Sequence, residues 1–260
     1  MQFLHFRLYG PMASWGEPAA NDLRPSAVQP GRAAILGLVG AALGVDRADP
    51  AAVRRLNEGY GLAILVEREG VPLDDYHTAQ VAPATLLKKA PHRTRSDELN
   101  FPRRDLDTVL SRRGYRCDAV YAVLLWPRIP EAWPLDHVAE KLRRPHYRLT
   151  LGRLACPLAL PLAPALLDAP DATQALARAP ALPAGLPERQ KRHLSPRPDT
   201  QTLRLFWDPR DQATIGPLGD RLQLDQTTPR RDQATDRGRW LFTDRLEARG
   251  RYTRAHGDPA

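Results

Sequence analysis

The sequence has little cysteine, little lysine and no long apolar run. Two cysteines in 260 residues, Cys117 and Cys156, are too few for a disulfide framework, so we expect reduced thiols, as in a cytoplasmic protein. No apolar run is long enough to cross a membrane. Residues 1–7 lack the basic and then apolar pattern of a secretion signal. The sequence therefore predicts a cytoplasmic protein without a membrane-bound part.

The common motifs of catalytic and metal sites are also missing. There is no Walker loop, no HExxH motif and no Cys/His spacing typical of zinc, so we expect neither cofactor nor metal. His77 is the candidate general base, since metal-free RNA cleavage needs a group that takes the proton of the 2′-OH. It follows Asp75 and Tyr76 at the end of an apolar strand, where a histidine is more often hydrogen-bonded structurally. No catalytic residue is predicted.

Positive charge is in excess. Lysine and arginine number 38 against 30 acidic residues, which gives a net charge of +8, and only four of the basic residues are lysine. A polyanionic partner, above all nucleic acid, fits this balance. The alternative is a basic but otherwise inert protein. Much of the excess lies in residues 83–116, where nine basic and four acidic residues give +5. This stretch, with its prolines, predicts a basic arm at about 82–116 inserted between two strands.

The first 44 residues predict a strand, a loop and a helix. Residues 3–8 alternate in polarity like a strand with one buried face, and residues 33–43 form an apolar helix rich in small residues. Arg24 in the loop and Arg32 at the helix N-terminus are the first candidates for phosphate contacts. Met12 and Trp15 offer surfaces for stacking a base. Trp15 could equally fill the core.

The order of further elements predicts an α+β, ferredoxin-like βαββαβ core with an open sheet face, the surface that RNA-recognition domains use. Its remaining elements are a short helix capped by Asp49, strands at 60–66 and 71–78 that pair with each other, a strand at 117–126, a helix at 133–142 and extended pieces at 149–157.

The domain prediction places this core at 1–162. An irregular Ala/Pro-rich segment follows at 163–200 and a small β-rich part at 201–248, with strands near 202–207, 221–224 and 239–243. Residues 249–260 are predicted to be a disordered tail.

Several stretches of residues 1–162 resemble one protein family in order and spacing. They are Leu8–Gly16, Arg24-Pro25, Arg32–Gly44, Asp75–Thr78, Tyr115–Ala119, Leu125-Trp126, Leu142–Tyr147 and Leu151–Leu158. Together they are similar to the CasD family, the fifth Cas family within the RAMP superfamily, of type I-E CRISPR Cascade complexes. Residues 164–228 match poorly.

The resemblance implies a non-catalytic subunit that caps the 5′ handle of the CRISPR RNA (crRNA). It implies contacts with the backbone subunit CasC, the large subunit CasA and nearby target DNA. The arm at 82–116 then corresponds to a thumb that separates handle from guide. Within this arm, we expect four arginines to contact nucleic acid or subunits: Arg93, Arg95, Arg103 and Arg104.

A second candidate RNA-binding cluster consists of Tyr147, Arg148, Gly152 and Arg153. A tyrosine flanked by arginines can stack a base and hold phosphates, and glycine permits a close backbone approach. Tyr147 could equally be an ordinary strand aromatic. Two alternative functions stay open: a metal-independent endoribonuclease that processes repeat RNA, and a free-standing RNA-binding module.

Overall fold

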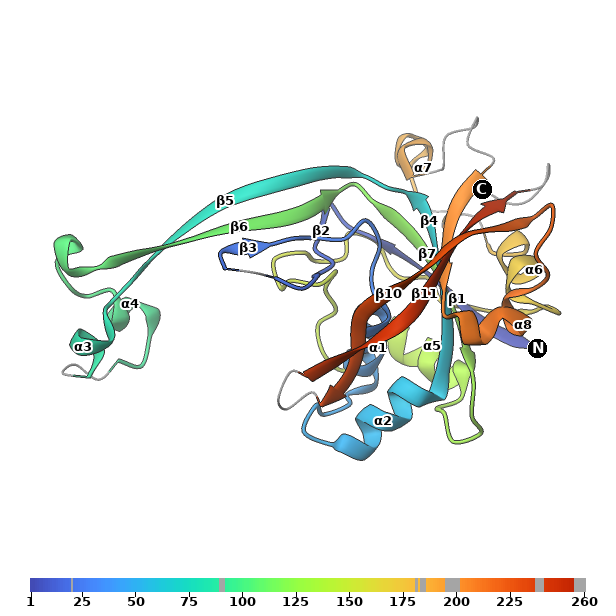
Figure 1. The fold of residues 1–260 in the computed structure, drawn as a ribbon, viewed down its shortest axis with the longest axis horizontal. Coiled ribbons are helices and arrows are strands. Elements are labelled where there is room, and N and C mark those ends of the chain that lie inside the picture. The colour runs from blue at the N-terminus through green and yellow to red at the C-terminus, as the bar shows by residue number, and fades with distance from the viewer. Residues whose placement is uncertain are drawn as a thin grey trace.

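Two sheets organise the chain, as Figure 1 shows: a central sheet in the body and a smaller one that continues into a long arm. The computed structural model describes residues 1–19, 21–88, 92–180, 182, 186–194, 202–236 and 241–254. The strands are β1 (Gln2–Tyr9), β2 (Met12–Ala13), β3 (Leu23–Arg24), β4 (Tyr60–Arg68), β5 (Val71–Val81), β6 (Asp107–Cys117), β7 (Val120–Pro127), β8 (Ala165–Asp168), β9 (Thr202–Trp207), β10 (Leu222–Asp236) and β11 (Leu241–Thr253). The α-helices are α1 (Arg32–Leu43), α2 (Pro50–Gly59), α3 (Ala84–Leu87), α4 (Arg95–Glu98), α5 (Leu135–Arg143), α6 (Ala172–Ala177), α7 (Glu188–Leu194) and α8 (Gln212–Ile215), and the 3₁₀ turns are η1 (Arg103–Asp105) and η2 (Pro209–Asp211).

The central sheet runs in the order β10-β11-β9-β4-β7-β1-β8, and its neighbouring strands are antiparallel. The fold is thus a mixed α/β architecture with mainly antiparallel sheets. β4 and β7 are almost continuously apolar, so both of their faces need to be covered. They lie in the middle of the sheet, where nearly their whole length is buried. The helix predicted after Asp49 is confirmed, since this side chain accepts hydrogen bonds from the backbone N–H groups of Ala51 and Ala52.

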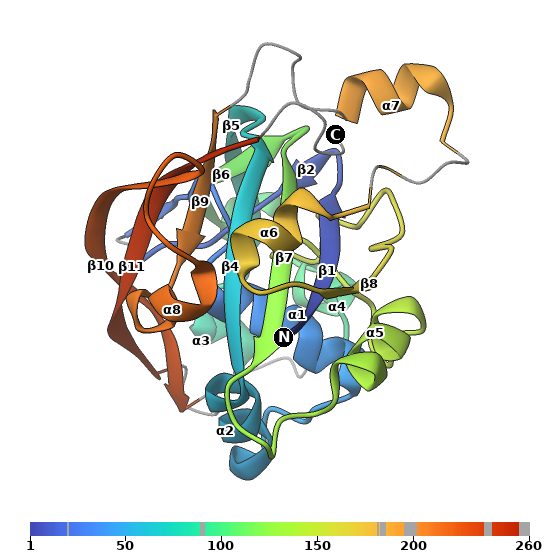
Figure 2. The same cartoon turned by 90° about the vertical axis from the view of Figure 1, so that its right-hand side faces the viewer.

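The central sheet is covered on both faces, so the expectation of an open face is wrong. One face packs on α1 and α5 through side chains such as Leu4, Phe6 and Val123. The other buries Phe3 and Trp126 with α6, which lies in front of the central strands in Figure 2. Successive side chains of β1 point to opposite faces of the sheet, and both faces carry apolar residues. Each face therefore needs a layer that covers it.

The arm is a hairpin of β5 and β6, paired from Val71↔Cys117 to Val81↔Asp107. The strand expected at 71–78 is therefore confirmed, but its partner is β6 and not β4, whose edges are occupied by β7 and β9. Gly70 makes the sharp exit from β4: its φ is +69°, and a Cβ there would stand 2.2 Å from the Cys117 carbonyl oxygen. The arm therefore begins at residue 71 and not at the expected residue 82. Its residues 107–117 form the strand β6.

The C-terminal third belongs to the same sheet as the core. β8 pairs with β1 although it lies beyond residue 162, and β9 pairs with β4. The extended pieces expected at 149–157 do not form a regular strand: the stretch turns at Gly152, as expected, and contains one isolated bridge, Thr150↔Pro157. The tail expected from residue 249 is also wrong up to Thr253, since Tyr252 is fully buried within β11. Residues 255–260 of that tail lie outside the described residues.

Among the described residues, no helix is both long enough and apolar enough to cross a membrane. Cys117 and Cys156 are free cysteines.

Candidate nucleic-acid interface

Arg153 joins three segments at the root of the arm. Its Nη1 donates to the Gly114 carbonyl oxygen at 3.1 Å and its Nη2 to that of Arg24 at 3.1 Å. The guanidinium also lies over the Tyr115 ring, 4.7 Å from the ring centre. Two of the predicted site residues, Arg24 and Arg153, are thus brought together although they lie 129 positions apart in the sequence.

Arg24 lies on the exposed strand β3, which pairs in parallel with β6 so that Arg24 stands opposite Arg113 and Leu23 opposite Arg112. Its Nη1 donates to two backbone carbonyl oxygens of its own loop, those of Asn21 at 2.5 Å and Leu23 at 3.0 Å. This register concentrates positive charge at the arm root. Arg112 and Arg113 fall within the predicted arm but were not among the predicted site residues, because strand pairing across 89 positions leaves no local signal in the sequence.

Gly152 adopts a left-handed conformation with φ +90°. A Cβ at this position would stand 1.8 Å from the Ser14 carbonyl oxygen, and Ser14 N donates to the Leu151 oxygen at 2.9 Å. The expected close backbone approach is therefore present, but it is made to this chain's own loop. Gly152 fixes the loop that carries Arg153.

Tyr147 is exposed and stands beside a hollow of about 330 Å³ between α1 and α2. Its backbone N–H donates to the Ala41 oxygen at 3.1 Å, which anchors it to the end of α1. Its ring and the His146 ring are nearly perpendicular, with their centres 4.5 Å apart. Asn57 and Arg47 also line this hollow. An exposed ring beside a mainly apolar hollow with a few polar side chains in its wall can hold an unstacked base. Arg148, also exposed, lines a neighbouring hollow on the α5 side.

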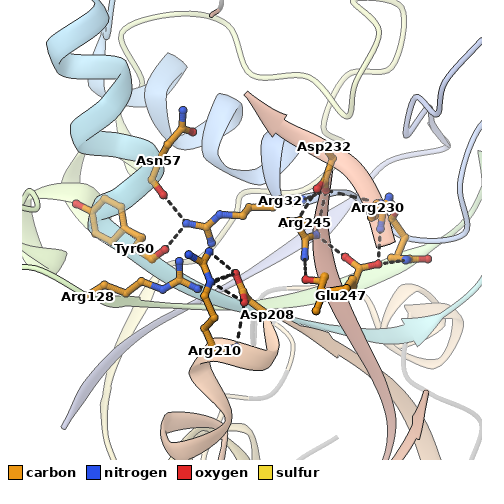
Figure 3. Close-up of polar contacts among 12 residues, drawn as sticks. Arg32, Asn57, Tyr60, Arg128, Asp208, Arg210, Arg230, Asp232, Arg245 and Glu247 are labelled. Atoms are coloured by element: carbon orange, nitrogen blue, oxygen red, sulfur yellow. Dashed lines mark hydrogen bonds and ion pairs between the residues drawn. The ribbon is translucent and has the colours of Figure 1, made fainter. Parts of the chain in front are cut away.

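Arg32 is the main correction to the predicted site. Its side chain is only 4% exposed, and its Nη2 donates to the carbonyl oxygens of Asn57 at 2.6 Å and Tyr60 at 2.5 Å (Figure 3). Its backbone N–H at the start of α1 donates to Asp232 Oδ2 at 2.7 Å. The prediction that Arg32 holds a phosphate is wrong, because its guanidinium faces the interior and a carboxylate occupies the helix N-terminus.

The carboxylate of Asp232 is itself held in a network of buried charges. Arg245 Nε donates to Asp232 Oδ1 at 2.6 Å and Arg245 Nη2 to Glu247 Oε1 at 2.6 Å, while Arg230 Nη1 reaches Glu247 Oε2 at 2.8 Å (Figure 3). Burial, together with the positive charges of Arg128 and Arg245, lowers the pKa of Arg32 to about 9. The anion that suits this helix N-terminus therefore comes from β10 of the same chain.

We expect Arg32→Ala to lower the free energy of unfolding by about 3 kcal/mol, because two buried carbonyl oxygens lose their donor and a cavity remains. Arg24→Ala, the matched exposed substitution, should change it by less than about 0.5 kcal/mol. Urea unfolding followed by circular dichroism measures both. Equal stability of the two variants would contradict the structural role of Arg32.

Trp15 and Met12 do not form an open stacking platform. Trp15 is 2% exposed and packs edge-on against Tyr121, with ring centres 5.7 Å apart. Of the two roles predicted for Trp15, stacking a base is therefore wrong and filling the core is confirmed. Met12, in β2, is half-buried and packs against the same core. Both residues anchor the loop between β1 and β3 to the core.

The arginines of the arm tip lie apart from the root cluster, as Figure 1 shows for α4. Arg93, Arg103 and Arg104 are exposed, whereas Arg95 Nη1 pairs with Glu98 at 2.6 Å and its Nη2 donates to the Gln80 carbonyl oxygen. The arm thus carries a second positive surface, separate from the one at its root.

His77 lies on β5 in the arm, half exposed, with Nδ1 3.7 Å from Asp75 Oδ2. The carboxylate can orient the imidazole, but the pair stands on an exposed hairpin. Among the residues that the structure describes, no cluster of His, Cys, Asp or Glu could hold a metal ion.

Comparison with known proteins identifies the family. The family model described as CRISPR-associated protein (Cas_Cas5) matches residues 3–245. The CRISPR system Cascade subunit CasD of Escherichia coli (strain K12) is 31% identical over 182 residues, which cover 67% of this chain and 75% of that protein. These matches confirm the resemblance seen in the sequence.

Solved structures agree. A chain of a CRISPR RNA-guided surveillance complex superimposes with a TM-score of 0.65 at 26% identity, covering 100% of this chain and 93% of its own. A crystal structure of a Cas protein, 22% identical, matches the fold with a TM-score of 0.60 over 99% of this chain and 100% of its own. The chain belongs to the Cas5 family of CRISPR-associated proteins.

Proposed function

We propose that this protein is a non-catalytic subunit of a type I-E CRISPR Cascade complex that binds and caps the 5′ handle of crRNA. The observation that carries this proposal is the 31% identity to a Cascade subunit over most of both chains. The net charge of +8 and the arginines at the arm root suit an RNA partner.

The RNA strand would run along the arm root. Arg24 and Arg112, exposed at the arm root, and Arg148, exposed on the α5 side, would supply cations for phosphates, while Tyr147, beside α1 and α2, would supply an aromatic ring for an unstacked base. Arg153 positions Arg24 and the arm through its two backbone hydrogen bonds. Single-stranded RNA is recognised by this combination of stacking and phosphate contacts, with little need for a deep pocket.

The arm would act as the thumb that separates handle from guide and would contact CasC, CasA and nearby target DNA. A two-stranded hairpin is marginally stable alone, and this one leaves apolar side chains uncovered. Its large exposed apolar residues are Val71, Leu73, Tyr76, Val109 and Leu110. The arginines proposed for the nucleic-acid or subunit contacts are Arg93, Arg95, Arg103 and Arg104.

We also propose a ferredoxin-like core for the body. The adjacent antiparallel strands β8-β1-β7-β4, with α1 and α5 packed in one core cluster on the same side, support it. The added strands β9, β10 and β11 then extend the β4 edge.

Tyr147→Ala should weaken binding of a labelled single-stranded repeat RNA by roughly tenfold, because a stacked base contributes about 1–3 kcal/mol. Tyr147→Phe is the matched control and should retain the affinity, since it keeps the ring. Fluorescence anisotropy at fixed salt gives both dissociation constants. Equal binding by Tyr147→Ala and the unsubstituted protein would remove Tyr147 from the interface.

The competing function, an endoribonuclease, rests on His77 and its Asp75 neighbour. We expect labelled repeat RNA incubated with the protein in EDTA to keep its full length. A specific cleavage product that disappears in His77→Ala would establish catalysis and overturn the non-catalytic proposal.

A further inference from the structure

The two faces of the arm carry different side chains. In the hairpin of β5 and β6, successive side chains point to opposite faces, and residues that stand opposite each other share a face. Val71, Leu73 and Val109 therefore lie on one face, while Tyr76 and Leu110 lie on the other, the tyrosine face. Each of these five side chains is at least 42% exposed. The exposed tyrosine of the hairpin is thus separated from three of its exposed aliphatic residues.

Tyr76 belongs to a row of exposed side chains that crosses three strands. Arg112 of β6 lies directly opposite Tyr76 of β5, and its neighbour on the other side is Leu23 of β3. Directly opposed residues of antiparallel strands have Cβ atoms about 5 Å apart, so the tyrosine ring and the guanidinium can contact the same ligand. Tyr76 is 61% exposed, and Arg112 is exposed as well. An aromatic ring and a positive charge therefore face solvent side by side.

The Arg112 guanidinium is available to a ligand. Among the described residues it has no hydrogen-bond or ion-pair partner, and Asp74, the one acidic residue of β5 and β6 on the tyrosine face, forms no ion pair with it. The arginines of the opposite face are engaged: Arg113 Nε donates to Ser111 Oγ at 3.1 Å, and Arg24 Nη1 donates to carbonyl oxygens of its own loop. The uncommitted guanidinium of this pair of strands is thus the one beside the tyrosine.

The row also lies between the two positive surfaces of the arm. Tyr76 is five residues from Val71 and five from Val81, the two ends of β5. At the rise of an extended strand this is about 17 Å in each direction. The arginine cluster of the arm root lies on one side of it, and the exposed arginines of the arm tip lie on the other (Figure 1). A nucleic-acid strand that contacts both positive surfaces has to pass the middle of the hairpin.

We propose that the tyrosine face binds one unstacked base of the single-stranded RNA, with the base on the Tyr76 ring and its phosphate on Arg112. The inference rests on the proposed RNA-binding function and adds a base site to that of Tyr147. An exposed aromatic ring beside an arginine is the combination by which proteins hold single strands without reading their sequence. The aliphatic residues of the opposite face suit a protein subunit instead.

The first test measures binding of a labelled single-stranded repeat RNA to the full-length protein by fluorescence anisotropy. Tyr76→Ala should weaken binding about tenfold, and Tyr76→Phe should retain the affinity because it keeps the ring. Val109→Ala, the matched control on the opposite face, should leave the affinity unchanged. Arg112→Gln should weaken binding and lower the slope of log K against log salt by about 0.7, the value for one phosphate contact on a single strand.

The second test locates the base. Repeat RNAs that carry 5-iodouridine at one position in turn are bound and irradiated, and mass spectrometry identifies the crosslinked peptide. At least one of them should crosslink to Tyr76. If RNA binds Tyr76→Ala with full affinity and no crosslink reaches Tyr76, the base site is wrong and the RNA-binding function stands.

Two further outcomes would also overturn the proposal. If Tyr76→Ala leaves RNA affinity unchanged and reduces only the amount of other Cascade subunits that co-purify, the tyrosine face binds protein. If the unsubstituted protein binds no RNA at all, the proposed function fails, and the base site fails with it.

Discussion

Glu67→Gln is expected to lower the free energy of unfolding by about 3–5 kcal/mol, because it removes one partner of a buried ion pair. Glu67 lies in β4 at 5% exposure and receives Arg7 Nε at 2.8 Å and Arg254 Nη2 at 2.8 Å. It thereby ties β1 and the end of the C-terminal strand to the middle of the sheet. Loss of its charge leaves both guanidinium groups without their carboxylate.

Asp225→Asn is the matched control, because Asp225 pairs with Arg251 at 2.9 Å on the exposed side of the same C-terminal strand. This variant should change stability by less than about 1 kcal/mol. Urea unfolding of both variants supplies the comparison. A loss at Glu67 no larger than that at Asp225 would contradict the structural role of the buried pair.

The same carboxylate predicts a pH dependence. Burial alone would raise the pKa of Glu67, but Arg7 and Arg254 outweigh it and hold the pKa below its ordinary value of 4.5. Its contribution to stability is therefore complete above pH 4.5 and is lost as the pH falls through the lower, folded-state pKa. Unfolding free energies measured at falling pH should decline less steeply for Glu67→Gln than for the unsubstituted protein. Parallel curves would show that Glu67 is not coupled to folding.

Gly152→Ala should have the second large effect, a loss of about 3 kcal/mol or more. The new Cβ would meet the Ser14 carbonyl oxygen at 1.8 Å, and the residue would also keep a positive φ of +90°. Since the Cβ would clash with a backbone carbonyl oxygen, and the positive φ is itself a property of the backbone, rotation of a side chain cannot relieve either problem. The loop at Arg153 would shift, and RNA affinity should fall with stability.

Gly219→Ala is the control, because nothing lies within 4 Å of a Cβ there. It should be neutral or slightly stabilising, by up to about 1 kcal/mol. Thermal unfolding and RNA anisotropy of the two variants provide the readouts. A Gly152→Ala protein as stable as Gly219→Ala would mean that the loop does not pack on Ser14 in this way.

Local patterns predicted the central elements well. β4, β7 and the helix at 33–43, observed as Arg32–Leu43, follow from continuous apolar runs that a short window contains. Strand partners were harder to predict. β5 alternates as well as any edge strand, but nothing in its own residues says that it pairs with β6 rather than β4. β8 is too short to stand out within an Ala/Pro-rich stretch.

The candidate site shows the same limit. An arginine at a helix N-terminus is a sound local reason to expect a phosphate, yet Asp232 reaches the Arg32 backbone from 200 positions away. Nothing in the sequence around Arg230, Arg231 and Asp232 indicated that Asp232 would bind the N-terminus of α1, and no role was predicted for it. Arg24 and Arg153, in contrast, were predicted as members of two separate clusters. The hydrogen bond from Arg153 to the Arg24 carbonyl oxygen, which brings them together, was not predicted.

The most direct measurement is purification of the tagged full-length protein from cells that also express its CRISPR repeat array and the neighbouring subunits. We expect crRNA of the same length as in the complex without the tag to co-purify with it, together with the other Cascade subunits. Arg24→Ala combined with Tyr147→Ala should reduce the retained RNA. Recovery of the protein free of RNA and of other subunits would contradict the proposed function.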